Sequence, residues 1–174
     1  MLNDIVCMHV IDTLGLTGNI SEQLSEEKAE EIYNMIIDNW ILANKREHCY
    51  TEQRVVEYCC VFTPKSILEE SLKESQIYFT NKDDEVIGFC SIAKDNDGYE
   101  LKRLNVRDDY QGQGLGSFIT NLRMNILKEY GIKEVYIDSM LFPSTIRFHE
   151  KNGFTRSMNE SRYEEYAVRM TKSL

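Results

Sequence analysis

Three glycines within six residues, in the run Gln111-Gly112-Gln113-Gly114-Leu115-Gly116, constrain the local fold of this chain more than any other feature. The run follows a segment with strand spacing, residues 99–106, and opens one with helical spacing. Glycine lets the backbone turn sharply and approach a ligand without interference from a Cβ atom. The free N–H groups and the dipole of the helix start then form an anion site, and a diphosphate is its natural occupant. A purely structural glycine turn is the alternative on these residues alone.

Two common nucleotide-binding motifs do not fit this run. Its spacing is G-x-G-x-G, whereas the dinucleotide fingerprint is G-x-G-x-x-G, and no Lys-Ser/Thr pair follows the glycines as it does in phosphate-binding loops. Nucleotide binding is therefore disfavoured.

Composition and charge narrow the class of partner. The 174 residues fit one domain, 1–174, and 42% hydrophobic with 28% charged residues is typical of a soluble globular protein. No apolar run approaches the roughly 20 residues that span a bilayer, and residues 1–16 lack the basic start of a secretion signal, so we expect no membrane partner and a cytoplasmic location. The net charge of −9 disfavours nucleic acid. It is compatible with a cationic substrate such as a polyamine or a lysine-bearing peptide, although acidic surfaces also simply keep proteins soluble.

The cysteines predict neither disulfides nor a metal site. Their number, five, is odd, and no pair has Cys-x-x-Cys spacing. The three histidines are scattered, so we expect no metal. Cys59 and Cys60 lie beside Val55 and Val56 on an apolar helix face, which predicts core packing there.

Hydrophobic spacing predicts an α/β fold around one central mixed, mostly antiparallel sheet flanked by helices. Caps at Ser25, Thr51 and Thr63 begin three helices, the first ending near residue 44 and the third near residue 74. Residues 1–20 fit a strand or a helix equally and are poorly assigned. The later elements are strands at 76–80, 85–93, 99–106, 133–140, 154–159 and 164–170, with helices from 115 to near 131 and at 144–151. The step from 99–106 through a helix to 133–140 predicts a right-handed βαβ crossover.

Two segments carry a family resemblance. The stretch from Leu104 to Gly116 resembles the acetyl-CoA signature of the GNAT superfamily of N-acetyltransferases, a strand ending in Leu-x-Val, a short loop, and Gln/Arg-x-x-Gly-x-Gly/Ala opening a helix. The stretch from Phe148 to Phe154, Phe-His-Glu-Lys-Asn-Gly-Phe, is similar to the family's Phe-Tyr-Glu-Lys-x-Gly-Phe segment. One helix and one strand separate the two, as in the family. The resemblance implies a single-domain GNAT-like acyl-CoA N-acyltransferase fold and an acetyl-CoA-dependent N-acetyltransferase.

The resemblance also implies where acetyl-CoA binds as co-substrate. In the family, the strand carrying Leu104, Asn105 and Val106 splays from the strand that begins at Lys133. The backbone groups exposed at Leu104 and Val106 would pair with the pantetheine amides, using an otherwise unsatisfied strand edge. The backbone N–H groups that would hold the pyrophosphate are those of Gln111, Gly112, Gln113, Gly114, Leu115, Gly116 and Ser117.

Glu100 is the candidate general base. It precedes Val106 by the spacing at which some histone-acetylating relatives place a glutamate base, and such a base must reach the amine directly or through one water. An exposed strand carboxylate in a cross-strand salt bridge is an equally weighted alternative. Tyr99 and Asp138 are weaker candidates for the base.

His149 is the candidate proton donor for the leaving thiolate. It stands where many family members have a tyrosine, and an imidazole can donate a proton near neutral pH. It could also only pack against the cofactor's sulfur, and Ser144 and Tyr136 are substitutes. A backbone N–H near Val106 would polarise the acetyl carbonyl. Cys90 lies on a predicted strand and not on a nucleophile turn, so direct attack in a ternary complex is preferred over an acyl-enzyme.

The sequence does not identify the molecule that accepts the acetyl group. We expect a primary amine of a small molecule or peptide, bound by the helices at 25–74 and the last hairpin, which flank the acceptor side in the family. Two alternatives stay open: a non-catalytic acyl-CoA-binding or regulatory module, and a protein N-acetyltransferase with a dedicated partner. A homodimer is also compatible, because dimers are common among similar proteins.

Overall fold

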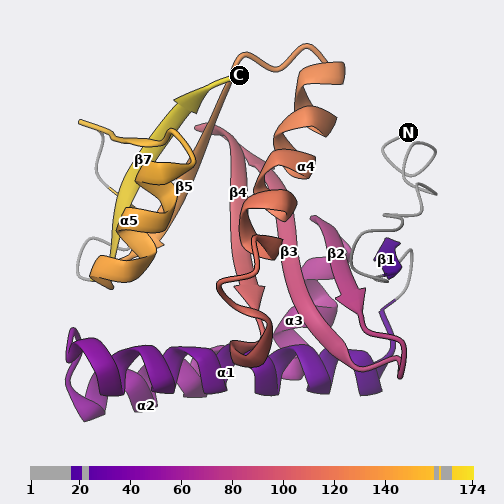
Figure 1. Ribbon diagram of the computed structural model, residues 1–174, viewed down its shortest axis with the longest axis vertical. Coiled ribbons are helices and arrows are strands. Elements are labelled where there is room, and N and C mark those ends of the chain that lie inside the picture. Colours follow the sequence, from indigo (N-terminus) through magenta and orange to yellow (C-terminus); the bar gives the residue numbers. More distant parts are fainter. Residues whose placement is uncertain (1–16, 21–23, 159–160, 162–165) are drawn as a thin grey trace.

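Helices cover both faces of an open sheet in the computed structural model, which describes residues 17–20, 24–158, 161 and 166–174 (Figure 1). The helices are α1 (Glu26–Glu47), α2 (Glu52–Val61), α3 (Pro64–Ser71), α4 (Leu115–Glu129) and α5 (Pro143–Lys151), with a 3-10 turn, η1, at Asp108–Tyr110. The strands are β1 (Thr17–Ile20), β2 (Ser75–Thr80), β3 (Val86–Asp95), β4 (Gly98–Val106), β5 (Glu134–Met140), β6 (Thr155–Arg156) and β7 (Ala167–Ser173).

The described strands form one sheet in the order β1-β2-β3-β4-β5-β7-β6. All neighbouring pairs are antiparallel except β4 and β5, which are parallel and joined through α4. Parallel neighbours need a crossover, and the helix supplies it. The predicted mixed, mostly antiparallel α/β fold is therefore confirmed.

The helix starts follow the predicted capping residues. The Ser25 hydroxyl accepts a hydrogen bond from the Lys28 N–H at the start of α1, at 3.2 Å. Thr63 and Ser66 form a reciprocal capping box at α3, with Pro64 in the first turn, where its missing N–H is harmless. Each bond satisfies a backbone donor that a helix start leaves unpaired.

Clusters of buried hydrophobic residues lie against both faces of the sheet. On one face, Ile119 of α4 packs with Phe79 and Ile87 of β2 and β3. On the other face, Ile32 and Ile67 of α1 and α3 pack with residues of β3 that include Val86 and Phe89. Successive strand residues point to opposite faces, so the buried run of β3 contributes to both cores.

Some boundaries differ from the prediction. The last hairpin was predicted at 154–159 and 164–170, but β6 has only two residues and β7 begins at Ala167. Residues 159–160 and 162–165 of the predicted hairpin lie outside the described residues. β1 comes from the segment that the sequence left open, and it pairs with β2. No helix in the described ranges is long and apolar enough to cross a membrane.

The predicted core packing of Cys60 is wrong. Cys60 is exposed on α2, and Val56 of the same helix is 60% exposed. The buried residues of this core come from α1 and α3 instead, and no α2 side chain that the structure describes is buried. The side chain of Cys59 lies outside the described set.

Candidate active site

β4 and β5 separate over most of their length. Their pairing has one registered position, between Glu100 and Tyr136, although the two strands have nine and seven residues. The Arg107 N–H donates to the Ile87 carbonyl on β3, at 2.9 Å. Because backbone groups alternate sides along a strand, those of Val106 face the opposite way, toward the separation. The expected splay is present, and Val106 borders it.

The glycine turn lies at the end of β4 and leads into α4. Gly112 and Gly114 have φ angles of +75° and +88°, which L side chains rarely adopt. A Cβ atom built at either position would meet nothing within 4 Å, so the backbone there faces open space. The N–H groups that open α4 point toward this space, with the positive end of the helix dipole behind them. The residues fit a diphosphate, which needs such donors without side chains in the way.

The structure adds a residue that the sequence did not indicate. Asn39 of α1 donates from Nδ2 to the Val106 carbonyl at 2.9 Å, and Gln111 donates from Nε2 to the same oxygen at 2.9 Å. Asn39 also bonds the side chain of Asn105, which therefore points to the α1 face and away from the α4 face. Asn39 and Gln111 thus connect α1, the end of β4 and the glycine turn at one carbonyl.

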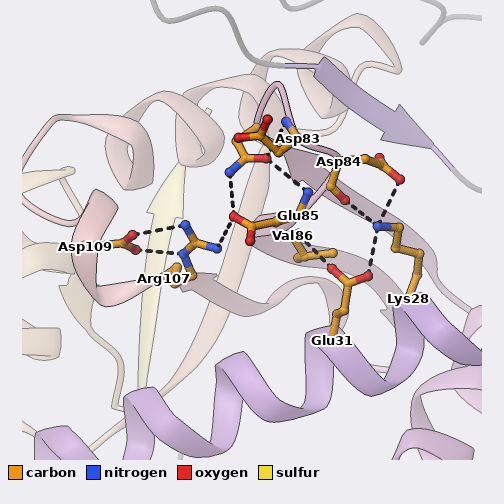
Figure 2. Close-up of polar contacts among 9 residues, drawn as sticks. Lys28, Glu31, Asp83, Asp84, Glu85, Val86, Arg107 and Asp109 are labelled. Carbon is orange, nitrogen blue, oxygen red and sulfur yellow. Dashed lines mark hydrogen bonds and ion pairs between the residues drawn. The ribbon is translucent and has the colours of Figure 1, made fainter.

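Arg107 holds the loop between β4 and the glycine turn. Its guanidinium makes two parallel bonds to Asp109, at 2.8 and 3.0 Å, and a third to Glu85 at 3.2 Å (Figure 2). These carboxylates raise the pKa of Arg107 further above its ordinary value. A forked pair of this kind fixes orientation as well as distance. Arg107 therefore joins the β2–β3 turn to η1, immediately before Gln111.

We expect Arg107→Ala to raise the Kd for acetyl-CoA about three- to tenfold, because η1 would lose the contacts that orient the glycine turn. This change corresponds to about 0.7 to 1.4 kcal/mol, the net contribution of one ordinary hydrogen bond. The melting temperature should change little, since partly exposed ion pairs contribute about 1 kcal/mol or less. Calorimetric titration measures the Kd. Arg107→Lys is the control: it retains the charge but cannot form the fork, so wild-type affinity in this variant would mean that charge alone matters.

An open acidic groove of about 760 Å³ lies beside this loop, between α1 and the β2–β3 turn. Eight of its lining residues are acidic, and two, Lys28 and Arg107, are basic. Figure 2 shows Lys28 placed between Glu31 and Asp84, where it forms ion pairs of 2.9 and 3.2 Å. Asn39 lines the groove as well, so the groove reaches the end of β4.

β4 carries an irregularity next to the splay. Its register with β3 shifts between Phe89 and Ser91, and Arg103 has a φ of +52°, an uncommon value for a non-glycine residue. Lys102 and Arg103 both point toward α3 and the connection that follows it. Lys102 pairs with Glu74 of this connection, and Arg103 pairs with Glu70 of α3 at 2.6 Å.

Glu100 lies at the closed end of the splay, beside Tyr136. Leu101 packs with the α4 face, so Glu100 points to the face of α1 and α3. Its side chain is 4% exposed, in contrast to the exposed carboxylate considered as the alternative. This buried carboxylate therefore lies on the face opposite the glycine turn, next to the point where β4 and β5 part.

His149 is buried on α5, with ring-edge contacts to Phe148 and Phe154. Burial, and then the nearby charge of Arg123, lower the pKa of His149 from 6.5 to about 4. The imidazole is therefore neutral at pH 7, and its Nδ1 has no hydrogen-bond partner. These features favour a packing role for the His149 ring over a role as a cationic proton donor.

The depressed pKa of His149 predicts acid sensitivity. Between pH 6.5 and about 4 the unfolded chain binds a proton here that the folded chain does not, so this part of the stability is complete above pH 6.5 and falls as the pH drops. At about 1.4 kcal/mol per pH unit, the total loss of stability from pH 6.5 to below pH 4 is about 3 to 4 kcal/mol. Urea unfolding at pH 7 and pH 5 measures it. His149→Phe should remove most of the difference, whereas His48→Asn, at an exposed position, should retain it.

The other candidate side chains are engaged elsewhere. The Tyr136 hydroxyl donates to Asp95, and the Ser144 hydroxyl bonds Glu47 at the end of α1. Asp138 makes two bonds to Arg169, each of 3.0 Å. Burial raises the pKa of the Cys90 thiol to about 11, which makes a thiolate nucleophile there unfavourable at neutral pH.

Comparison with solved structures gives the same fold. The chain resembles the paia N-acetyltransferase from Thermoplasma acidophilum, solved with coenzyme A, at 19% identity and a TM-score of 0.74, over 91% of this chain and 99% of that one. The ribosomal-protein-S18-alanine N-acetyltransferase from Escherichia coli matches at 16% identity and a TM-score of 0.59, over 90% and 94% of the two chains. An aminoglycoside 6'-N-acetyltransferase solved with coenzyme A matches at 12% identity and a TM-score of 0.61, over 90% and 96%.

Comparison with curated proteins found no match. The model of the Acetyltransferase (GNAT) family matches residues 29–154, a range that begins in α1, contains the splayed strands and the glycine turn, and ends after α5. The chain therefore belongs to the GNAT family of acetyltransferases.

Proposed function

We propose that this protein transfers the acetyl group of acetyl-CoA directly to a primary amine of a small molecule or peptide, in a ternary complex. The observation that carries the proposal is the single registered pair between β4 and β5, with the α4 N-terminus and two open glycines at the end of β4. A strand edge there supplies amide partners for an extended chain, and the helix start supplies donors for a diphosphate.

The proposed cofactor site uses backbone groups on the α4 face. Those of Gln111 to Ser117 hold the pyrophosphate, and those of Leu104 and Val106 bind the pantetheine chain. The Val106 carbonyl accepts bonds from Asn39 and Gln111, so binding exchanges or shares those donors. At Arg103 the backbone departs from the regular sheet ladder. This departure supports the proposal that a backbone N–H near Val106 points toward the acetyl oxygen and polarises the carbonyl.

The acceptor is proposed to bind on the opposite face, where Glu100 acts as the base. Direct attack is preferred, because the Cys90 thiol stays protonated. A cationic acceptor is favoured by the acidic groove, whose field concentrates amines near the end of β4. The names of the structural neighbours include a ribosomal protein and an aminoglycoside as acceptors, so the fold accommodates both peptides and small molecules.

One observation supports a second candidate, a non-catalytic acyl-CoA-binding module. His149 occupies the position of the family's tyrosine acid, and its low pKa argues against proton donation. Such a module would bind acetyl-CoA and turn over no amine.

Calorimetric titration with acetyl-CoA, and separately with ATP and NAD, tests the cofactor site. Saturable binding of acetyl-CoA alone supports the proposal, and a screen of polyamines, aminoglycosides and peptides by thiol release then tests catalysis. Binding with no thiol release from any amine favours the non-catalytic module. If acetyl-CoA does not bind at millimolar concentration, both candidates are wrong.

A further inference from the structure

Each of the two helices that share the cofactor face directs a buried, nitrogen-bearing polar side chain inward. Arg123 comes from α4 and is 1% exposed, and His149 comes from α5 and is 8% exposed. Each has a buried nitrogen without a hydrogen-bond partner, Nε of Arg123 and Nδ1 of His149. After burial, the Arg123 charge is the second cause that lowers the pKa of the His149 ring, so the two groups are near enough to interact. Buried polar atoms are nearly always satisfied, which makes two unsatisfied ones together a sign of a missing partner.

Arg123 is fixed at the β4 irregularity. Its Nη1 donates to the Ser91 carbonyl of β3 at 3.3 Å and to the Lys102 carbonyl of β4 at 3.0 Å. Lys102 immediately precedes Arg103, where the backbone leaves the regular ladder. The guanidinium therefore lies on the α4 face beside the strand that borders the splay.

No carboxylate within the described ranges pairs with Arg123. The ionisable groups that act on it or respond to it there are the Cys90 thiol and the His149 imidazole. Burial raises the pKa of Cys90 to about 11 and lowers that of His149 to about 4, so both are neutral at pH 7. Burial also lowers the pKa of Arg123 itself, which means that the folded chain disfavours its charge.

Burying a cation without a counter-ion destabilises a folded protein. Such a group is retained where an anion arrives during function, as in catalytic sites that hold charge in place for a transition state. His149 is neutral at pH 7, so no imidazolium is available there to protonate a leaving thiolate. A fixed positive charge on the neighbouring helix serves that purpose without a proton.

We infer that Arg123 stabilises the thiolate of coenzyme A as it leaves, in place of a proton donor from α5; this inference rests on the proposed function. In the step, a bond forms between the acceptor nitrogen and the acetyl carbon, and the carbon–sulfur bond breaks with its electron pair on sulfur. The proton of the amine passes to Glu100, and the thiolate takes a proton from solvent after release. His149 contributes a neutral, close-packed wall beside the sulfur.

The test is a titration of the thiol of bound coenzyme A, followed by the ultraviolet absorbance of the thiolate. An opposite charge at close range lowers a thiol pKa by about 1 to 3 units, so coenzyme A bound to the wild-type protein should ionise that far below free coenzyme A. This measurement needs neither a variant nor an acceptor. If wild type binds coenzyme A but its thiol titrates like free coenzyme A, the inference is wrong while the proposed function stands.

Three variants separate charge from structure. Arg123→Met should return the thiol pKa to that of free coenzyme A while binding persists, and Arg123→Lys should keep part of the shift. Lys128→Met removes a charge from the exposed last turn of the same helix and should leave the wild-type shift intact. If Arg123→Met binds coenzyme A and keeps the full shift, Arg123 is not the source. If Arg123→Met fails to fold, the wild-type and Arg123→Lys titrations still decide.

Two results with the wild-type protein alone would contradict the inference. If calorimetry detects no binding of coenzyme A or acetyl-CoA to the wild type, the proposed function fails, and this inference fails with it. If an ordered water occupies the region between Arg123 and His149 and remains when coenzyme A binds, the thiol is unshifted in wild type and variants alike, which also contradicts the inference.

Discussion

Gly114→Trp is expected to abolish measurable binding of acetyl-CoA, and Gly114→Ala to raise its Kd at least about tenfold, equivalent to about 1.4 kcal/mol. Gly114 immediately precedes α4, where the backbone faces open space at a φ of +88°. A ligand diphosphate that contacts the helix start occupies the volume that a Cβ atom would fill. The loss therefore comes from steric exclusion in the complex, because the unliganded protein has room for the side chain.

Strain is the competing explanation for such a loss, and the chain offers a matched control. Gly131 lies just beyond the other end of α4, with a φ of +75° and nothing within 4 Å of the place that a Cβ atom would take. An L residue in this left-handed conformation costs about 1 to 2 kcal/mol at either position. Gly114→Ala and Gly131→Ala should thus lose similar stability in thermal melts, while only the first loses affinity. Equal affinities in the two variants would remove the glycine turn from the cofactor site.

The features that were predicted correctly depend on near neighbours in the chain. Ser25 and Thr63 cap their helices with bonds that reach only three residues ahead. The glycine turn, the helix after it and the parallel crossover follow from the contiguous segment 99–140. In this segment the spacing of hydrophobic residues changes from that of a strand to that of a helix and back. Local chemistry determines these elements, so the sequence is sufficient to predict them.

The features that were missed depend on contacts between distant segments. In the sequence, Asn39 is a polar position on an amphipathic helix. Its connection with the site depends on bonds to Asn105 and Val106, which lie 66 and 67 residues away. Arg123 occupies a helix that also carries Leu122 and Ile126, and its burial follows from how α4 lies across β3 and β4. A lone arginine within an apolar helix pattern is the one signal that could have identified it.

The irregularity at Arg103 could not be predicted for a similar reason. A left-handed φ favours glycine or asparagine, and arginine gives no sign of it. The pairs of Lys102 with Glu74 and of Arg103 with Glu70 hold both side chains toward α3. Tertiary contacts therefore impose this conformation on a residue that has no local preference for it.

Glu100→Gln is expected to lower kcat about 10²- to 10⁴-fold at neutral pH, the range for loss of a general base, with the Kd for acetyl-CoA unchanged. Glutamine keeps the shape of the buried side chain and one acceptor oxygen, but its amide cannot accept the proton of an acceptor amine. Position supports the assignment, because Glu100 lies at the closed end of the splay and points to the face opposite the glycine turn. Steady-state kinetics with an amine identified in the screen measures the effect.

The pH profile distinguishes a base from a structural carboxylate. An amine that is already neutral needs no base, so Glu100→Gln should regain activity as the pH rises toward the pKa of the acceptor, near about 10.4 for a lysine-like amine. A fold defect would not be repaired by raising the pH. Glu134→Gln, at an exposed position two residues before Tyr136 on β5, is the control and should keep wild-type kinetics. If Glu100→Gln is as active as wild type at pH 7, Glu100 is not the base. Asp138→Asn is then the next variant to measure, although the Asp138 carboxylate already accepts two bonds from Arg169.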